Sequence, residues 1–293
     1  MQIGRYTVDG ELGRGGMGVV LRVRDPAGRV VALKLLEKDR SDRAERFARE
    51  ARLQEQLGEA AGFVPLLDIG TSAHGPFLVM PLLPGGTLRD RLLAGPLGVD
   101  EAVELTTTLA DALGRAHEAG VVHRDMKPDN VLFTEDGRPL VADLGLGKHF
   151  RRDLSGASLS VALSAGGEMR GTLGYVAPEQ LRDASAVGPP ADVFALGVVL
   201  YECLTGRQPF VGATFMELLA AVASGAKDPL PGDCPRWLRD VVDQALAPSP
   251  QDRIPDAAAF ASALRARRSR SRLPRLGIAL FVLAGLSAGA VAV

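Results

Sequence analysis

A glycine cluster near the N-terminus constrains the fold of this 293-residue chain more than any other feature. Residues 13–18 read Gly-Arg-Gly-Gly-Met-Gly and lie within residues 6–36, where Val/Leu-rich runs have the composition of β-strands. A dinucleotide-binding turn has the same glycine spacing, but it expects a helix directly afterwards and an acidic residue about 20 residues further on. Here a β-like run follows, so the pattern predicts a hairpin whose backbone N–H groups can cover phosphates.

A single lysine follows this hairpin, at the end of the run Val-Ala-Leu-Lys at 31–34. Lys34 is within reach of the same phosphates. Residues 42–57 then change to the period of a helix, and Glu50 lies on its apolar face. A carboxylate on an inward face needs a cation, and Lys34 is the obvious candidate.

The remaining chain is predicted to be a short β-rich part followed by a larger helical part. Two more β-like runs, at 63–69 and 76–82, end in Pro-Gly-Gly at 84–86, which predicts a cleft near that point. From residue 99 the apolar spacing becomes helical, and Gly120 provides a stop signal. Further helices are expected at about 191–205, 213–224, 235–246 and 256–266.

The decisive polar cluster is His-Arg-Asp-Met-Lys-Pro-Asp-Asn at 123–130, followed by Asp-Leu-Gly at 143–145. Together with the glycine loop, the Val-Ala-Leu-Lys run, Gly-Thr-Leu-Gly-Tyr-Val-Ala-Pro-Glu at 171–179 and Asp192, it resembles the protein kinase superfamily. The resemblance is specifically to the bacterial Hanks-type (eukaryotic-like) serine/threonine kinases, many of which are membrane-anchored. Leu144 replaces the usual Phe of the family and keeps an apolar plug at that place.

The resemblance covers about residues 5–265 and implies a bilobal α+β kinase fold. The small N-lobe, about residues 5–83, would be β-rich with one main helix, and the larger helical C-lobe would span about 84–265. A basic juxtamembrane segment at 266–275 and a transmembrane helix at 276–293 would follow.

The same resemblance implies a role for each charged residue of the motifs. Asp125 would orient the substrate hydroxyl and accept its proton, and Lys127 would steady the γ-phosphate. Lys34 would hold the α- and β-phosphates of ATP and would itself be fixed by Glu50. The residues that would bind Mg²⁺, or Mn²⁺ in its place, are Asn130 and Asp143.

Apolar residues would hold the adenine ring of ATP. Met80 resembles the gatekeeper, and Leu83 would supply the hinge N–H. Pro81 lies where the hinge contributes only a carbonyl, so its missing N–H has no cost. The residues that would sandwich the adenine are Val20, Ala32 and Leu132. The full implied ATP-binding set is Leu12, Gly13, Gly15, Gly16, Gly18, Val20, Ala32, Lys34, Met80, Pro81, Leu83 and Leu132.

Two details favour protein Ser/Thr hydroxyls as the acceptor: Lys127 after Asp125, and Thr172 in the 171–179 segment. The expected partners are therefore protein substrates and the chain itself, through autophosphorylation. Arg124 could pair with a phosphate on the loop 143–179 and order it. The hydroxyls of that loop are Ser155, Ser158, Ser160, Ser164 and Thr172, of which Thr172 is favoured as a substrate-positioning group. A pseudokinase that binds nucleotide without transfer, and a small-molecule kinase, remain as alternatives.

The formal net charge of −1 conceals an uneven distribution. Residues 265–293 contain six arginines and no acidic residue, which leaves 28 basic and 35 acidic residues over 1–264, a net charge of −7. The acidic body gives no reason to expect a nucleic-acid partner.

After the arginines, Leu276–Val293 holds 18 uncharged residues. As a helix this run is about 27 Å long, against a hydrocarbon core of about 30 Å, and it predicts a single-pass span in contact with membrane lipid.

The flanks of this span predict its orientation. Residues 1–10 lack the apolar core of a signal peptide, and arginines precede the span, so the kinase domain is expected on the cytoplasmic side of the cell membrane. A buried C-terminal helix is the alternative interpretation. Gly285 and Gly289 form a Gly-x-x-x-Gly spacing that would let two such helices approach closely, which makes a homodimer a candidate.

Overall fold

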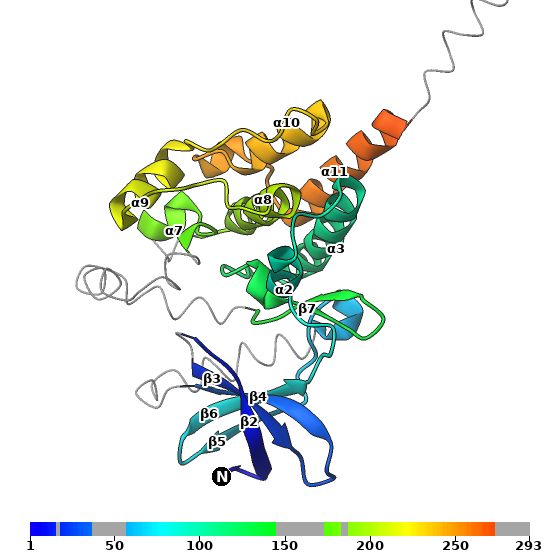
Figure 1. Ribbon diagram of the computed structural model, residues 1–293, viewed down its shortest axis with the longest axis vertical. Helices are drawn as coiled ribbons and strands as arrows, with labels where there is room; N and C mark the ends of the chain where they lie inside the picture. Colours follow the sequence, from blue (N-terminus) through cyan, green and yellow to red (C-terminus); the bar gives the residue numbers. More distant parts are fainter. Residues whose placement is uncertain (16–17, 37–56, 145–172, 183–186, 273–293) are drawn as a thin grey trace, which may run out of the picture.

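The computed structural model describes residues 1–15, 18–36, 57–144, 173–182 and 187–272. A six-stranded antiparallel sheet forms one lobe, and α-helices form most of the other (Figure 1). This is the bilobal α+β architecture that the sequence predicts. Of the helix expected at 42–57, all but the last residue lies outside the described residues, and so does Glu50.

The sheet has the strand order β1-β2-β3-β4-β6-β5, and β3 and β4 lie in its middle. Its register places Val20 of β3 opposite Lys34 of β4, and Ala32 of β4 opposite Met80 of β6. These four residues therefore lie on one face of the sheet, across the neighbouring strands β3, β4 and β6. The strands are β1 Gln2–Ile3, β2 Tyr6–Gly15, β3 Gly18–Arg24, β4 Val30–Leu36, β5 Asp68–Ser72 and β6 Gly75–Pro81.

The predicted hairpin joins β2 and β3, with Gly15 paired to Gly18 next to its tip. At Gly18 φ is +137°, and a Cβ would lie 2.0 Å from the carbonyl oxygen of Leu35, so only glycine fits beside β4. At Gly13 and Gly15, by contrast, a Cβ would meet nothing within 4 Å. Their backbone is thus open to a ligand, whereas Gly18 is required by packing. Gly16 lies outside the described residues.

The strand predicted at 63–69 is wrong in its placement, because β5 begins only at its end. Phe63 and Val64 are fully buried, and the Val64 N–H donates to the carbonyl of Val141 in the other lobe, at 2.9 Å. Pro65, which follows, has no N–H for a strand ladder. The apolar run therefore reflects burial where the lobes meet.

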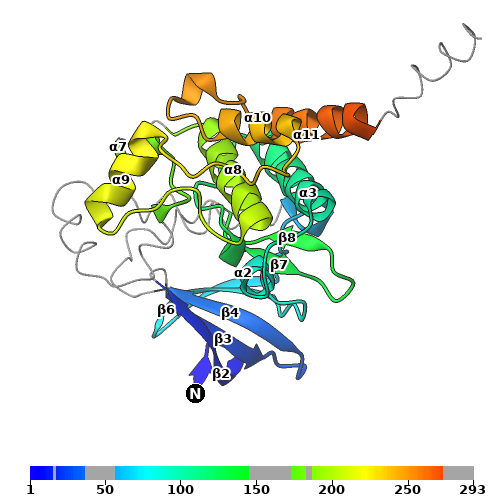
Figure 2. The same cartoon turned by 45° about the horizontal axis from the view of Figure 1, so that its top comes forward.

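The C-lobe is built around α8, which is buried on nearly every side and is packed by α3, α10 and α11 (Figure 2). The helices predicted from residue 99 and from about 191, 213, 235 and 256 are all confirmed, whereas α2 and α7 were not predicted. The α-helices are α2 Leu88–Leu93, α3 Val99–Glu118, α7 Pro178–Arg182, α8 Pro190–Thr205, α9 Phe215–Ser224, α10 Arg236–Ala245 and α11 Ala257–Arg272. The 3-10 helices are η2 Glu59–Ala61, η3 Pro128–Asn130 and η5 Pro250–Asp252, and the small second sheet pairs β7 Val131–Phe133 with β8 Pro139–Val141.

Helix α11 packs along α3 and ends at the side of the C-lobe that is remote from the six-stranded sheet (Figures 1 and 2). It extends to Arg272, so the segment predicted as basic at 266–275 begins in a helix. Among the described residues, no helix is both long and apolar enough to cross a membrane. The span predicted at 276–293 lies outside those residues.

Candidate active site

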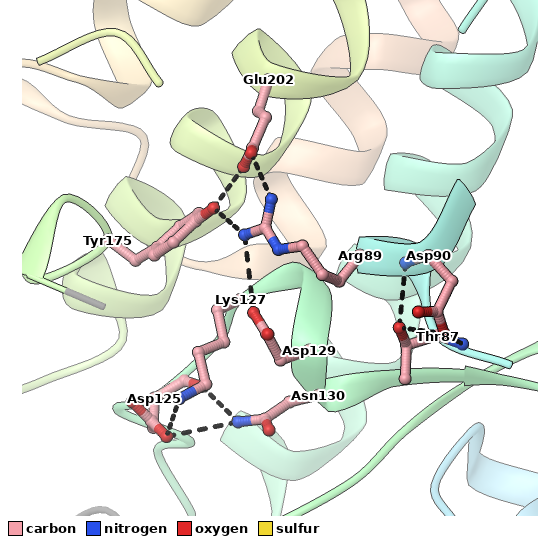
Figure 3. A network of polar contacts seen from close by, with 9 residues as sticks. All are labelled: Thr87, Arg89, Asp90, Asp125, Lys127, Asp129, Asn130, Tyr175 and Glu202. Carbon is pink, nitrogen blue, oxygen red and sulfur yellow. Dashed lines mark hydrogen bonds and ion pairs between the residues drawn. The ribbon is translucent and has the colours of Figure 1, made fainter. Parts of the chain in front are cut away.

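The loop between α3 and β7 brings together two predicted catalytic residues, Asp125 and Lys127, and the predicted metal ligand Asn130 (Figure 3). The Asn130 side-chain NH₂ donates to the Asp125 backbone carbonyl at 2.7 Å and to its carboxylate oxygen Oδ2 at 3.3 Å. The Lys127 ammonium lies 3.5 Å from the same Oδ2. Asp125 and Asn130 are both buried. The carboxylate of Asp125 is thus held in one orientation next to a cation.

The backbone of this loop is strained immediately before Asp125, because Arg124 has φ +69°. Such a conformation costs on the order of 1–3 kcal/mol for a non-glycine residue. The fully buried carboxylate of Asp192 stabilises it by accepting the N–H of Arg124 at 2.7 Å and that of His123 at 2.8 Å. Burial alone would raise the pKa of Asp192, but the hydrogen bond from His117 and the backbone bonds outweigh it and the pKa is lowered. Asp192 is therefore a scaffold residue of the catalytic loop.

His123 joins the catalytic loop to the end of β8. Its ring Nδ1 accepts the N–H of Asp125 at 3.2 Å, which leaves Nε2 to donate to the carbonyl of Ala142 at 2.8 Å. The ring is fully buried. His123 therefore fixes the distance between Asp125 and Asp143, the residue that follows Ala142.

Lys34 and Asp143 meet between the two lobes. The Lys34 ammonium lies 2.5 Å from Asp143 Oδ2, and both side chains are largely shielded from solvent. Burial by itself would raise the pKa of Asp143, but the charge of Lys34 outweighs it and the pKa is lowered. Asp143 also has a left-handed backbone, with φ +60°. Next to it, Leu144 is 1% exposed in the C-lobe core, as expected for an apolar plug.

The residues predicted to hold the adenine ring lie in one apolar cluster at the junction of the lobes. Val20, Ala32, Met80, Leu83 and Leu132 all belong to it, although they come from four separate elements and a linker. Ala32 and Met80 are buried, while the other three are partly exposed. We call it the inter-lobe cluster.

Two further residues of the predicted ATP-binding set, Leu12 and Pro81, are not members of this cluster. Pro81 ends β6 and is paired with Val31. Leu12 on β2 is 47% exposed. Its contact with a nucleotide stays a prediction.

Oxygen ligands for a divalent cation are available in the same place. Because the amide NH₂ of Asn130 is held by Asp125, its oxygen remains to coordinate a cation, and Asp143 offers a carboxylate. Within the described residues there is no group of three or more His, Cys, Asp or Glu side chains that could hold a metal. Asn130 and Asp143 therefore fit Mg²⁺, which commonly takes one or two protein oxygens and completes its shell with substrate phosphates and water.

A second polar network, which no sequence pattern predicts, adjoins the catalytic loop (Figure 3). Arg89 of α2 contacts Glu202 of α8, the hydroxyl of Tyr175 and Asp129 of η3. These residues lie far apart along the chain. The short helix that carries Arg89 was itself not predicted, so no periodicity pointed to this residue.

A buried ion pair holds the described segment that begins at residue 173. Arg253 donates to both carboxylate oxygens of Glu179, at 2.7 and 2.8 Å, and its side chain is fully buried. The pair therefore ties Glu179, the last residue of the motif at 171–179, to the C-lobe.

Comparisons with known proteins agree with this geometry. The model of the family described as "Protein kinase domain" matches residues 6–264. The chain is 35% identical over 283 residues to "Serine/threonine-protein kinase PknL" of Mycobacterium tuberculosis, an alignment that covers 94% of this chain and 68% of that protein. It is 36% identical over 247 residues to "Probable serine/threonine-protein kinase PkwA" of Thermomonospora curvata, covering 82% and 31%. It is 34% identical over 284 residues to PknA of M. tuberculosis, covering 93% and 63%. The chain belongs to the protein kinase domain family.

Proposed function

We propose that this chain is an ATP- and Mg²⁺-dependent serine/threonine protein kinase that transfers the γ-phosphate of ATP to Ser or Thr hydroxyls of proteins. The observation that carries this proposal is the convergence of Lys34, Asp125, Asn130 and Asp143 from both lobes on one place. The relatives named serine/threonine-protein kinase support the same activity.

Each side chain has a role that its surroundings support. Asp125, held by Asn130, accepts the proton of the acceptor hydroxyl, and the Lys127 ammonium steadies the γ-phosphate. The Lys34 ammonium holds the α- and β-phosphates. Mg²⁺, when bound to Asn130 and Asp143, supplies neutralisation of phosphate charge, and Mn²⁺ accepts the same oxygen ligands.

The inter-lobe cluster supports adenine binding. Apolar side chains from both lobes provide the two faces that a flat ring needs, with Val20 and Ala32 on one side and Leu132 on the other. A pseudokinase would need the nucleotide site alone, whereas here Asp125 is buried and fixed as well. The side chains for transfer are thus present, which favours an active enzyme.

Control by autophosphorylation is part of the proposal. Arg124 donates to the carbonyl of Val187 at 3.1 Å and so lies next to the segment that follows the loop. A phosphate carried by the loop could form charge-assisted hydrogen bonds with this guanidinium. The candidate sites Ser155, Ser158, Ser160, Ser164 and Thr172 lie outside the described residues.

We expect the wild-type protein, incubated with Mg²⁺ and ATP, to acquire phosphate within 143–179. Phosphopeptide mapping by mass spectrometry measures this, and the inactive Asp125→Asn variant is the control. Phosphate on another part of the chain, with none in this loop, would refute the control mechanism but leave the kinase activity standing. A wild-type protein that labels neither itself nor any acceptor protein would refute the activity.

We also propose that the chain is anchored in the cell membrane by residues 276–293, with the kinase domain on the cytoplasmic side. The support is the uncharged 18-residue run and the arginines before it. Gly285 and Gly289 would allow two copies to pack closely, so a homodimer is part of the same proposal.

The full chain should then sediment with membranes and resist extraction by high salt, whereas a version ending at Arg272 should stay in the supernatant. Salt matters because it would release a protein held by its arginines alone. Protease added to intact spheroplasts should leave residues 1–272 uncut. Recovery of both versions in the supernatant would contradict the anchor. Cleavage of residues 1–272 in intact spheroplasts would contradict the orientation.

A further inference from the structure

Arg89 is the centre of a polar network that the transfer chemistry does not use (Figure 3). Its Nη1 donates to Glu202 Oε1 at 2.6 Å, and its Nη2 donates to the Tyr175 hydroxyl at 2.7 Å. The same Nη2 lies 3.5 Å from Asp129 Oδ2. The Tyr175 hydroxyl in turn donates to the second oxygen of Glu202. One guanidinium therefore links α2, α8, the 173–177 segment and the catalytic loop.

The surroundings of Arg89 and Tyr175 keep these two donors of the network protonated. The Glu202 side chain is 5% exposed, and a carboxylate so buried needs a cation. Burial by itself would lower the pKa of Arg89, but the hydrogen bond to Glu202 outweighs it and the pKa is raised. Burial, followed by the negative charge of Glu202, raises the pKa of Tyr175. The guanidinium and the hydroxyl therefore stay protonated and remain hydrogen-bond donors.

Both ends of the network are attached to residues that flank Asp125. On one side, Asp129 lies in η3 directly before Asn130, whose amide donates to Asp125. On the other side, Tyr175 lies just before Ala177, whose N–H donates to the Gln180 side chain at 3.1 Å.

Gln180 completes the second connection, because its Nε2 donates to the carbonyl of Arg124 at 2.9 Å. Arg124 directly precedes Asp125 in the chain. Hydrogen bonds and short pieces of backbone thus form a closed ring that runs from Arg89 through both flanks of Asp125. A change at Arg89 would be transmitted to the position of the 173–177 segment relative to that carboxylate.

The ring is separate from the nucleotide side of the site. Neither Arg89 nor Tyr175 contacts Lys34 or Asp143 in the interactions described above, and neither belongs to the inter-lobe cluster. Arg89 and Asp129 are partly exposed, 31% and 50%, so the network reaches the surface beside the catalytic loop. This is where a protein substrate must lie to present its hydroxyl to Asp125.

We propose that Arg89 is a positioning residue for the protein substrate: it fixes the 173–177 segment against the catalytic loop so that an acceptor hydroxyl is presented to Asp125. The inference rests on the kinase activity proposed above. The proposal predicts different effects on the two substrates: loss of Arg89 should weaken use of the acceptor protein and leave ATP binding intact. The planar fork of arginine matters, since the compact ammonium of a lysine cannot reproduce the two separate NH₂ groups that face Glu202 and Tyr175.

The test compares full-length Arg89→Met with Arg91→Met, a matched arginine on the same short helix. Arg91 lies over the ring of Phe133, 3.2 Å from its centre, and is outside the network. With myelin basic protein as acceptor, Arg89→Met should raise the KM for the acceptor about tenfold, while the Kd of an ATP analogue changes less than about twofold. Arg91→Met should match the wild type, and Arg89→Lys should fall between the two.

Equal acceptor KM values for Arg89→Met and Arg91→Met would overturn the proposal. A parallel loss of ATP affinity and acceptor use would also overturn it, because it would show general damage to the fold. If Arg89→Met does not fold, Tyr175→Phe serves instead, since it removes one hydroxyl and keeps the buried ring; a smaller rise in acceptor KM is expected, and no rise overturns the proposal. A wild-type enzyme without transfer activity would instead refute the proposed function.

Discussion

Replacing Asp125 with Asn is expected to lower the rate of phosphoryl transfer about a thousandfold, the effect of losing a positioned general base. The amide has nearly the shape of the carboxylate, so the buried loop can keep its fold, but it has no charge to accept the proton of the acceptor hydroxyl. It also places an NH₂ near the Lys127 ammonium, which now forms an ion pair with a carboxylate, and near the Asn130 amide, which now donates to that carboxylate. Incorporation of the γ-phosphate into the chain and into an acceptor protein measures the effect.

Binding of ATP should survive this substitution, because Lys34, Asp143 and the inter-lobe cluster are unchanged. A fluorescent ATP analogue would measure the affinity. The matched control is Asp136→Asn, an exposed carboxylate in the turn between β7 and β8 that bonds locally to Thr134; it should keep wild-type activity. Wild-type activity in Asp125→Asn would contradict the assignment of the base, and zero activity in the wild type as well would favour the pseudokinase.

Replacing Arg253 with Met is expected to lower the free energy of unfolding by about 3–5 kcal/mol, as for other buried ion pairs that lose one partner. Besides the two bonds to Glu179, the guanidinium donates to three backbone carbonyls, at 2.7, 3.0 and 3.0 Å. It also stacks over Phe194, 4.9 Å from the ring centre. Methionine fills part of the volume but leaves the carboxylate and the carbonyls without their donor.

A urea titration followed by the fluorescence of Trp237, the only tryptophan in the chain, measures this loss. The control is Arg207→Met, which breaks an ion pair with Asp228 between side chains that are 63% and 44% exposed. Such surface pairs contribute about 0–1 kcal/mol. A loss for Arg253→Met no greater than for Arg207→Met would show that the buried pair does not stabilise the C-lobe.

Much of the site was predictable because its residues are close together in the sequence. Asp125, Lys127 and Asn130 fall within one loop, where the resemblance assigns each a role, and the structure places them in contact. The inter-lobe cluster was predictable only through the resemblance, since its members come from distant strands. The predicted partnership of Lys34 with Glu50 stays a prediction, because Glu50 lies outside the described residues.

The parts that could not be predicted depend on contacts over long chain distances. Arg89 is separated by 86 residues from Tyr175 and by 113 from Glu202, and it lies on a six-residue helix that is too short for a hydrophobic period. The strand expected at 63–69 failed for a related reason. Its apolar residues are buried by the opposite lobe, and burial produces the same apolar run as pairing in a sheet.

The position of α11 has a consequence for the membrane anchor proposed above. Residues after Arg272 start from the end of the molecule that is remote from the six-stranded sheet (Figure 1). A membrane tether attached at this end of α11 would leave the junction between the lobes unobstructed. Under the proposed membrane anchoring, large acceptor proteins would therefore approach Asp125 from the bulk phase, and the length of chain between Arg272 and the membrane would set the radius within which they are phosphorylated.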